Sequence, residues 1–190
     1  MDISDKKLIE NSLAGDNEAY TELLNRYLKP VYNFLQTFIR DPEVLDDLTQ
    51  ITFIKAWKNL KRFDPEKNFK TWIFIIAKNT AYDFFKKRKA LPFSAFTNEE
   101  GNNYLENVAT DEILPQEILE KVEQEKNFDE KINKLPDHYR TVLLLHYKEN
   151  ISFKEISQIL DVPYSTIKSR HQRALASLRK ILSSSGQSAQ

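Results

Sequence analysis

The sequence predicts an all-α protein of two small helical domains joined by a flexible acidic linker, the C-terminal domain being a helix-turn-helix. Three observations favour this fold class. Only three of the 190 residues are glycine, and long stretches contain no residue that breaks a helix. Apolar residues recur with the helical period in both halves of the chain. Between the halves, residues 91–110 lose this period and have the composition of an interdomain linker.

The first two predicted helices lie within residues 4–40. Ser4 and Asp16 are suited to cap them, because side-chain oxygens at these positions accept hydrogen bonds from free backbone N–H groups. The second helix begins near residue 17 and has apolar residues at helical spacing. Pro30 lies inside it and lacks an N–H donor, so we expect a kink or a break there.

Asp41-Pro42 marks the start of the third helix, because aspartate caps a helix and proline tolerates its first position. After a loop over residues 61–68, a fourth helix is predicted over residues 69–89. It ends in a basic cluster, which the negative end of the helix dipole favours. These helices make up the first predicted domain, residues 1–92.

The second predicted domain, residues 126–190, follows a linker over residues 93–125. Helical order resumes at residue 114, inside the last part of this linker, and continues almost to the C-terminus. The predicted helices are 114–135, 136–148, 152–160 and 163–183.

The helices 152–160 and 163–183 have the features of a helix-turn-helix. Ser152 and Glu155 are three residues apart and predict a capping box, in which each side chain binds the other's backbone N–H. Asp161 follows the first helix and tolerates the left-handed conformation that a tight turn needs. Pro163 suits the first position of the next helix, where its missing N–H has no partner to lose.

The last helix has an apolar and a polar face at 100° per residue. His171 lies in the middle of the apolar face, so we expect it in the core. The polar face has groups that can bind base edges, with cations at its rim that can bind phosphates. It carries Ser165, Thr166, Ser169, Gln172, Arg173 and Lys180, with Lys168, Arg170 and Arg179 at the edges. The pattern favours DNA binding, and an ordinary solvated basic face remains the alternative.

The formal net charge is zero, but the charges are distributed in blocks. Residues 54–89 carry eleven Lys or Arg against three acidic residues, a net charge of +8. Residues 93–125 carry nine acidic residues against one lysine, a net charge of −8. Residues 164–182 carry five cations and no acid. Two basic segments flanking an acidic one are compatible with a nucleic-acid partner in spite of the zero mean.

Composition excludes several classes of protein. Without cysteine, the chain has no disulfide and no thiolate metal site, and its three histidines lack metal-ligand spacing, so no metal or other cofactor is expected. The N-terminus is polar and periodic, unlike a signal peptide. The most apolar run, residues 72–77, is too short to span a bilayer. We therefore expect a cytoplasmic protein without membrane insertion and without a catalytic site.

Two segments resemble a known family. Residues 135–182, "LPDHYRTVLLLHYKENISFKEISQILDVPYSTIKSRHQRALASLRKIL", resemble region 4 of bacterial sigma factors, and most closely the extracytoplasmic-function (ECF) group of the sigma-70 family. Residues 46–89, "DDLTQITFIKAWKNLKRFDPEKNFKTWIFIIAKNTAYDFFKKRK", resemble region 2 of the same group. The two segments occur in the order found in the family, and together they cover most of the chain apart from the linker.

The resemblance implies a specificity subunit of RNA polymerase, which is not an enzyme. Region 2 would bind core RNA polymerase and open the −10 promoter element, and region 4 would bind the −35 element. An anti-sigma protein is a further candidate partner, which would have to cover the binding faces of both domains. The alternative is a helix-turn-helix transcription regulator with an N-terminal sensor or dimerisation domain.

The family's functional positions fall on three sets of residues. Core packing is the alternative for Leu48, Phe53 and Trp72. The core-polymerase set is Asp47, Leu48, Gln50 and Phe53. The −10 set is Lys70, Trp72, Asn79, Asp83, Lys86, Lys87 and Arg88, with the loop 63–68 completing a pocket for a flipped base. The −35 set is Ser165, Thr166, Lys168, Ser169, Arg170, Gln172 and Arg173, with the base-reading positions at Ser169, Gln172 and Arg173.

The chain departs from the family pattern at three positions. Ile51 follows Gln50 where the family usually has a glutamate, so a carboxylate often used at the polymerase interface is missing. Ser165 stands where a glycine is usual before the Thr-Ile-Lys-Ser-Arg run. Asp161 replaces the turn glycine of some members.

Overall fold

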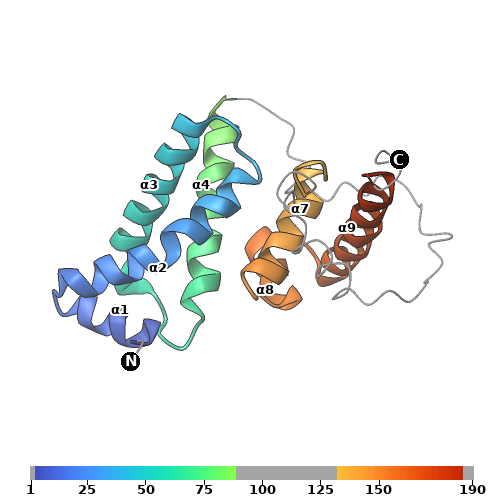
Figure 1. The fold of residues 1–190 in the computed structure, drawn as a ribbon. Coiled ribbons are helices and arrows are strands. Elements are labelled where there is room, and N and C mark those ends of the chain that lie inside the picture. The colour runs from blue at the N-terminus through green and yellow to red at the C-terminus, as the bar shows by residue number, and fades with distance from the viewer. Residues whose placement is uncertain (1–2, 89–131, 186–190) are drawn as a thin grey trace.

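The computed structural model describes residues 3–88 and 132–185, with side chains described as far as Ile181. Within these ranges every regular element is a helix (Figure 1). The first domain contains α1 (Asp5–Leu13), α2 (Asn17–Gln36), α3 (Pro42–Asn59), the short 3-10 helix η1 (Leu60–Arg62) and α4 (Phe69–Arg88). The second contains α7 (Asp137–Leu143), the π-helical turn η2 (Leu144–Lys148), α8 (Phe153–Leu160) and α9 (Tyr164–Ser185). The predicted acidic linker and most of the helix 114–135 lie outside the described residues.

The predicted caps of the first domain are confirmed. Ser4 accepts a hydrogen bond from the N–H of the first turn of α1, and Asp16 and Asp41 do the same for α2 and α3. α2 continues through Pro30 to Gln36, so the proline does not break it. Val31 and Phe34 follow the proline in α2 and are fully buried. This packing compensates for the hydrogen bond that the proline cannot make.

The capping box and the tight turn of the second domain are also confirmed. Ser152 and Glu155 each accept from the other's backbone N–H at the start of α8. Asp161 has φ 58° and ψ 47°, the left-handed conformation that the sequence allowed. The predicted helix 136–148 differs in one respect, because its second half is the π-helical turn η2, which closes with a bond from the Glu149 N–H to the Leu144 carbonyl of 3.1 Å.

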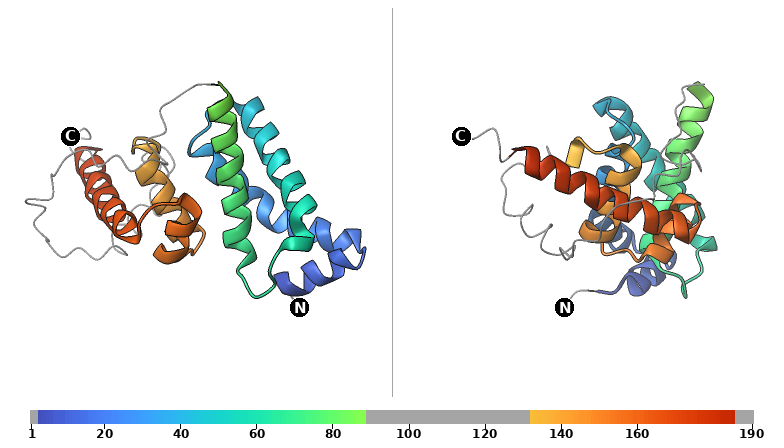
Figure 2. Two further views of the ribbon diagram at one scale, coloured as in Figure 1. Left: turned by 180° about the vertical axis from the view of Figure 1, so that it is seen from behind. Right: turned by 90° about the vertical axis from the view of Figure 1, so that its right-hand side faces the viewer.

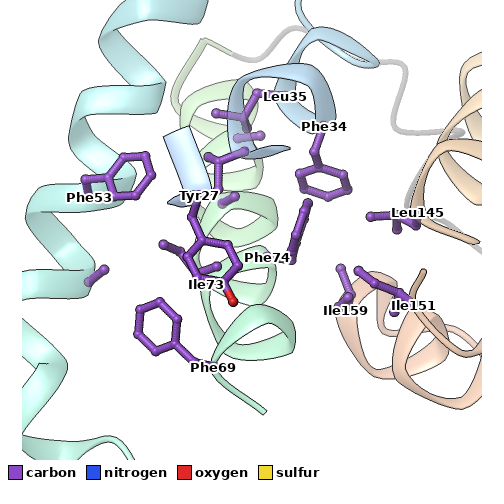
Figure 3. Packing of buried hydrophobic residues seen from close by; sticks show 14 of the residues in the cluster. Tyr27, Phe34, Leu35, Phe53, Phe69, Ile73, Phe74, Leu145, Ile151 and Ile159 are labelled. Atoms are coloured by element: carbon purple, nitrogen blue, oxygen red, sulfur yellow. The ribbon is translucent and has the colours of Figure 1, made fainter. Parts of the chain in front are cut away.

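One apolar core runs through both domains. The second domain lies beside α4 in every view, and α8 packs directly against α4 (Figure 2). At the junction, Phe34 of α2 and Phe74 of α4 face Leu145, Ile151 and Ile159 of the second domain, and all five are buried (Figure 3). A smaller cluster around Leu178 joins α9 to α7.

None of the helices within residues 3–88 and 132–185 combines the length and the apolar character that crossing a bilayer requires.

Candidate nucleic-acid and polymerase-binding surfaces

One side of α4 carries an aromatic ring, an amide and a carboxylate in line. Trp72, Asn79 and Asp83 are seven and four residues apart, which keeps them within about 40° around the helix. Trp72 is half-buried, with its ring centroid 5.0 Å from that of Phe63 and 5.4 Å from that of Phe69. Asn79 is exposed. The arrangement offers a held aromatic surface next to groups that can hydrogen-bond a base edge.

Asp83 extends this side of α4 towards α3. Its carboxylate lies 3.1 Å from Nζ of Lys55, an exposed ion pair that orients the side chain without burying it. The last turn of α4 carries exposed cations that can bind phosphates, and the Arg88 guanidinium lies over the Phe84 ring at 4.7 Å from its centroid. These cations are Lys86, Lys87 and Arg88.

Lys70 does not lie on this side of α4. It precedes Trp72 by two residues, so it points about 200° away around the helix. Its Nζ is 3.0 Å from the Glu149 carboxylate and donates to the Glu149 carbonyl at 2.5 Å. The structure therefore separates Lys70 from the other predicted −10 residues and directs it to the second domain.

The polar face predicted for the last helix is present on α9. Ser165, Lys168 and Gln172 are exposed on it. Ser169 donates to the Ser165 carbonyl at 3.0 Å, so its hydroxyl offers a partner mainly its lone pairs. We call this surface the recognition face; it comprises Ser165, Thr166, Lys168, Ser169, Gln172 and Arg173, of which Thr166, Ser169 and Arg173 are half-buried.

Arg170 is excluded from the recognition face. It is only 8% exposed, and it lies on the inner side of α9, which also carries Ile167 and Ala174. Burial lowers the pKa of its guanidinium, although the neighbouring Tyr139 acts in the opposite direction. The helical wheel placed Arg170 at an edge, and packing against the rest of the domain turned that edge inward.

His171 lies behind the recognition face, as predicted, and is buried. Its Nε2 is 2.7 Å from the Tyr147 hydroxyl, a hydrogen bond that joins α9 to η2. The rings of Phe153 and His146 lie 4.8 Å and 5.6 Å from it, centroid to centroid. Burial, together with repulsion from His146, lowers the pKa of His171 to about 4. The side chain is therefore neutral at physiological pH and supports the helix from within.

The stability of the protein is expected to fall below pH 6.5 because of His171. Its pKa is about 4 when folded and about 6.5 when unfolded, so between these values the unfolded chain binds the extra proton. The contribution is present above pH 6.5 and is lost as the pH falls to 4, a change of about 3 kcal/mol. Urea unfolding of wild type and of His171→Leu at pH 7 and pH 4.5 tests this. An unchanged pH dependence in His171→Leu, which keeps all carboxylates, would contradict it.

The predicted polymerase-binding residues of α3 point in two directions. Asp47 and Gln50 are exposed. Leu48 and Phe53 are 4% and 6% exposed and belong to the core, so the packing alternative holds for both of them. They lie on the side of α3 that packs on α2 and α4 and are not accessible in this structure.

The exposed side of α3 carries instead an apolar ridge that sequence reasoning did not single out. We define the apolar ridge as Ile51, Ile54 and Trp57, which are 40%, 53% and 42% exposed. Trp57 is held against Tyr20, with ring centroids 4.3 Å apart. Ile51, the residue that departs from the family pattern, thus contributes an exposed apolar side chain beside Gln50. Apolar residues exposed in a row typically mark a protein interface.

No group of three His, Asp or Glu side chains in the described part of the chain is arranged to hold a metal ion.

Comparison with known proteins identifies the family. A family model of sigma-70 region 2 matches residues 23–91, and one of sigma-70 region 4 matches residues 125–178. The ECF RNA polymerase sigma factor SigW of Bacillus subtilis is 32% identical over 184 residues, covering 96% of this chain and 98% of that protein. The chain belongs to the ECF group of the sigma-70 family. A second member, the ECF RNA polymerase sigma-E factor of Haemophilus influenzae, is 30% identical over 90% of this chain and 92% of its own.

Solved structures have the same fold as this ECF family member. CnrH, in complex with the cytosolic domain of CnrY, has a TM-score of 0.62 and 22% identity, covering 95% of this chain and 97% of its own. RpoE of Bartonella quintana, in complex with the anti-sigma factor NepR, has a TM-score of 0.60 and 23% identity over 86% of this chain and 96% of its own. The region-2 match covers most of α2 and all of α3 and α4, and the region-4 match covers α7, α8 and most of α9. We refer to helices α1–α4 as region 2 and to helices α7–α9 as region 4.

The sequence of α3 contains only a partial signal for the apolar ridge. The residues of α3 that the structure buries recur at Leu45, Leu48, Thr52 and Ala56, a single stripe at helical spacing. Ile51 and Ile54 lie off this stripe. The signal was obscured because α3 has large apolar residues on more than one side, so period alone does not identify the buried side.

Proposed function

We propose that the chain is an ECF sigma factor that binds core RNA polymerase and directs transcription initiation at promoters with −35 and −10 elements. The proposal rests on two surfaces that occur together on this member of the family. One is the side of α4 that carries Trp72, Asn79 and Asp83, and the other is the recognition face of α9. The protein supplies specificity, and RNA polymerase supplies the chemistry, so the chain is not itself an enzyme. It acts in the cytoplasm, where the polymerase is.

Region 2 holds the −10 strand on α4. Trp72 stacks on an unpaired base, and Asn79 and Asp83 hydrogen-bond base edges. The exposed cations at the end of α4 bind the phosphates that follow. The ion pair of Asp83 with Lys55 supports this role, because it fixes the carboxylate while leaving it accessible.

Region 4 places the recognition face of α9 in the major groove of the −35 element. Gln172 and Arg173 supply the donors and acceptors that distinguish bases, and Lys168 binds a phosphate. The inward position of Arg170 supports the assignment of specificity to Gln172 and Arg173, because Arg170 points into the domain while these two long side chains remain outside next to Ser169.

An anti-sigma factor is a proposed partner. CnrH forms a complex with the cytosolic domain of CnrY, and RpoE forms a complex with the anti-sigma factor NepR. The match of residues 23–91 to sigma-70 region 2 argues against the alternative of a regulator with an N-terminal sensor domain.

The test is reconstitution of initiation. Purified protein and a bacterial core RNA polymerase are incubated with fragments of the host genome, and the 5′ ends of the transcripts are sequenced. New start sites that share upstream −35 and −10 sequences are expected. If the protein adds no start site to those of core polymerase alone, the proposal is wrong.

Substitution of Ile54 by aspartate is expected to weaken binding to core RNA polymerase about 10- to 100-fold. Ile54 is the most exposed residue of the apolar ridge, and a charge there must be desolvated on docking. Its exposure predicts a change in folding stability within about 0.5 kcal/mol. Leu28→Asp is the control, because it is the same kind of change at a 43% exposed leucine of α2. The affinities for core RNA polymerase are measured by titration of labelled protein. Equal affinities of Ile54→Asp and Leu28→Asp would show that the apolar ridge is not part of the interface.

A further inference from the structure

One large apolar side chain of region 4 lies outside its core. Tyr164, the first residue of α9, is 51% exposed, whereas the other large apolar side chains in the described part of region 4 are buried or half-buried. No described residue forms a hydrogen bond or a ring contact with the Tyr164 side chain. A single exposed aromatic residue is common on a protein surface, so its position on the helix decides what it can do.

Tyr164 begins an exposed row along α9. Lys168 follows it after four residues and Gln172 after eight, and both are exposed. Four residues correspond to about 400° of rotation, so each member of the row is displaced by only about 40° from the one before it. An aromatic ring, an ammonium group and an amide therefore follow one another on the side of α9 that carries the recognition face.

The backbone on both sides of Tyr164 is anchored in the core of region 4. Before it, Val162 is 6% exposed, and its N–H donates to the Ser157 carbonyl at 3.2 Å. After it, Ile167 is fully buried, and its N–H donates to the Pro163 carbonyl at 3.2 Å. The start of α9 is therefore fixed before any partner binds, and only the two rotatable bonds of the tyrosine side chain remain to be ordered.

The start of α9 is also the part that a major groove would receive. The N-terminal residues of a recognition helix contact base edges in helix-turn-helix proteins. Tyr164 precedes Gln172 by about 12 Å along the helix axis. Successive base pairs are about 3.4 Å apart along DNA, so a base next to Tyr164 is not the one next to Gln172. Tyr164 therefore reaches a position of the −35 element beyond those assigned to Gln172 and Arg173.

Thymine is the base that suits an apolar ring at this place. In the major groove, adenine, guanine and cytosine present hydrogen-bond donors and acceptors, whereas thymine also presents its C5 methyl group. Covering a donor or an acceptor with a ring would leave it without a partner, which is unfavourable. Covering the methyl group removes apolar surface of both the ring and the base from water, which is favourable.

We infer that Tyr164 is a specificity-determining residue of the −35 interaction, and that its ring packs on the methyl group of a thymine at the edge of the element. The inference rests on the proposed function, because it takes α9 to bind the −35 element. It adds an apolar base contact to the hydrogen-bonding contacts of Gln172 and Arg173. Tyr164 lies outside the residues that the family resemblance assigned to DNA, which begin at Ser165.

Removal of the methyl group from the DNA tests this contact. In a promoter found in the reconstitution experiment, each thymine of the −35 element is replaced in turn by deoxyuridine, on both strands, and binding of the reconstituted holoenzyme is measured by competition. At one position deoxyuridine should weaken wild-type binding about fourfold, the effect of one buried methyl group. At that position Tyr164→Ala should bind thymine and deoxyuridine equally, and Tyr164→Phe should keep the wild-type difference.

Tyr82→Ala is the matched control. Tyr82 is a 42% exposed tyrosine of α4 in region 2, so its replacement should leave the difference between thymine and deoxyuridine in the −35 element unchanged. Tyr164→Ala should keep its Tm within about 2 °C of wild type, because Tyr164 is exposed. Loss of the difference in Tyr164→Ala is then not a loss of folding.

The outcomes distinguish this inference from the proposed function. If no deoxyuridine weakens wild-type binding, or if Tyr164→Ala keeps the difference, the ring does not contact a thymine methyl group. Loss of the difference in Tyr164→Phe as well would assign the contact to the hydroxyl and would also overturn the inference. Each of these results leaves the proposed function intact, because the wild-type holoenzyme still binds the promoter. A protein that adds no start site to core polymerase contradicts the proposed function itself, and this inference with it.

Discussion

Replacement of Gln172 and Arg173 by alanine is expected to lower promoter-dependent transcription by about two orders of magnitude. The two side chains are the long polar groups on the outward turn of α9, and each well-placed contact to a base edge contributes about 1–3 kcal/mol of discrimination. Because neither is part of the described core, the variant should keep its free energy of unfolding within about 1 kcal/mol of wild type. Multi-round transcription from a promoter found in the reconstitution experiment gives the measurement.

Lys168→Ala is the matched control for this double variant. Lys168 lies on the same face, and a phosphate contact carries no sequence information. Its loss should weaken binding evenly across −35 sequences and reduce the salt dependence by about one unit of slope, whereas Gln172→Ala with Arg173→Ala should change which sequences are preferred. If a randomised −35 library yields the same preference for wild type and the double variant, α9 does not read bases through these residues.

Phe74→Ala is expected to reduce the free energy of unfolding by about 3–5 kcal/mol, the largest loss predicted for a single substitution. Phe74 is fully buried, its ring packs edge to face against Phe34 with centroids 5.1 Å apart, and it faces region 4 across the shared core. Truncation leaves a cavity where helices from both regions meet. For a chain of this size the loss corresponds to a fall in Tm of about 10 °C.

Two further measurements make this prediction specific. Leu28→Ala also truncates a large apolar side chain to alanine, but at an exposed site, and should change Tm by no more than about 2 °C. Because the core is continuous, wild type should unfold in one cooperative transition by both circular dichroism and calorimetry. A Phe74→Ala variant with wild-type Tm, or separate transitions for the two regions, would show that the shared core does not stabilise the protein as described.

Local features were predictable because they depend on neighbours in the chain. The caps at Ser4, Asp16 and Asp41 and the left-handed Asp161 each follow from one side chain and the backbone a few residues away. The recognition face of α9 and the inward position of His171 follow from a single helical wheel. In each case one helix, treated alone, contained all the necessary information.

The surroundings of Arg170 and Lys70 could not be predicted from the sequence of one helix. The helical wheel placed Arg170 at the edge of a polar face, the family resemblance placed Lys70 among the −10 residues, and the prediction assigned both to DNA. The structure buries Arg170 within region 4 and pairs Lys70 with Glu149, a residue 79 positions away. Which edge of a helix becomes interior depends on the helices that pack against it, and these come from distant parts of the chain.

The sequence by itself determined the helices, their ends, the helix-turn-helix and the order of the two regions, because period, capping and turn chemistry are local. Only the tertiary structure decided that Leu48 and Phe53 are core while Ile51 and Ile54 are exposed, since α3 has apolar residues on more than one side. It alone also joined the two regions through Phe74, Leu145 and Ile159. A side chain becomes buried when another helix packs against it, and that helix can come from a distant part of the chain. The pattern of residues along one helix does not specify which other helix packs against it.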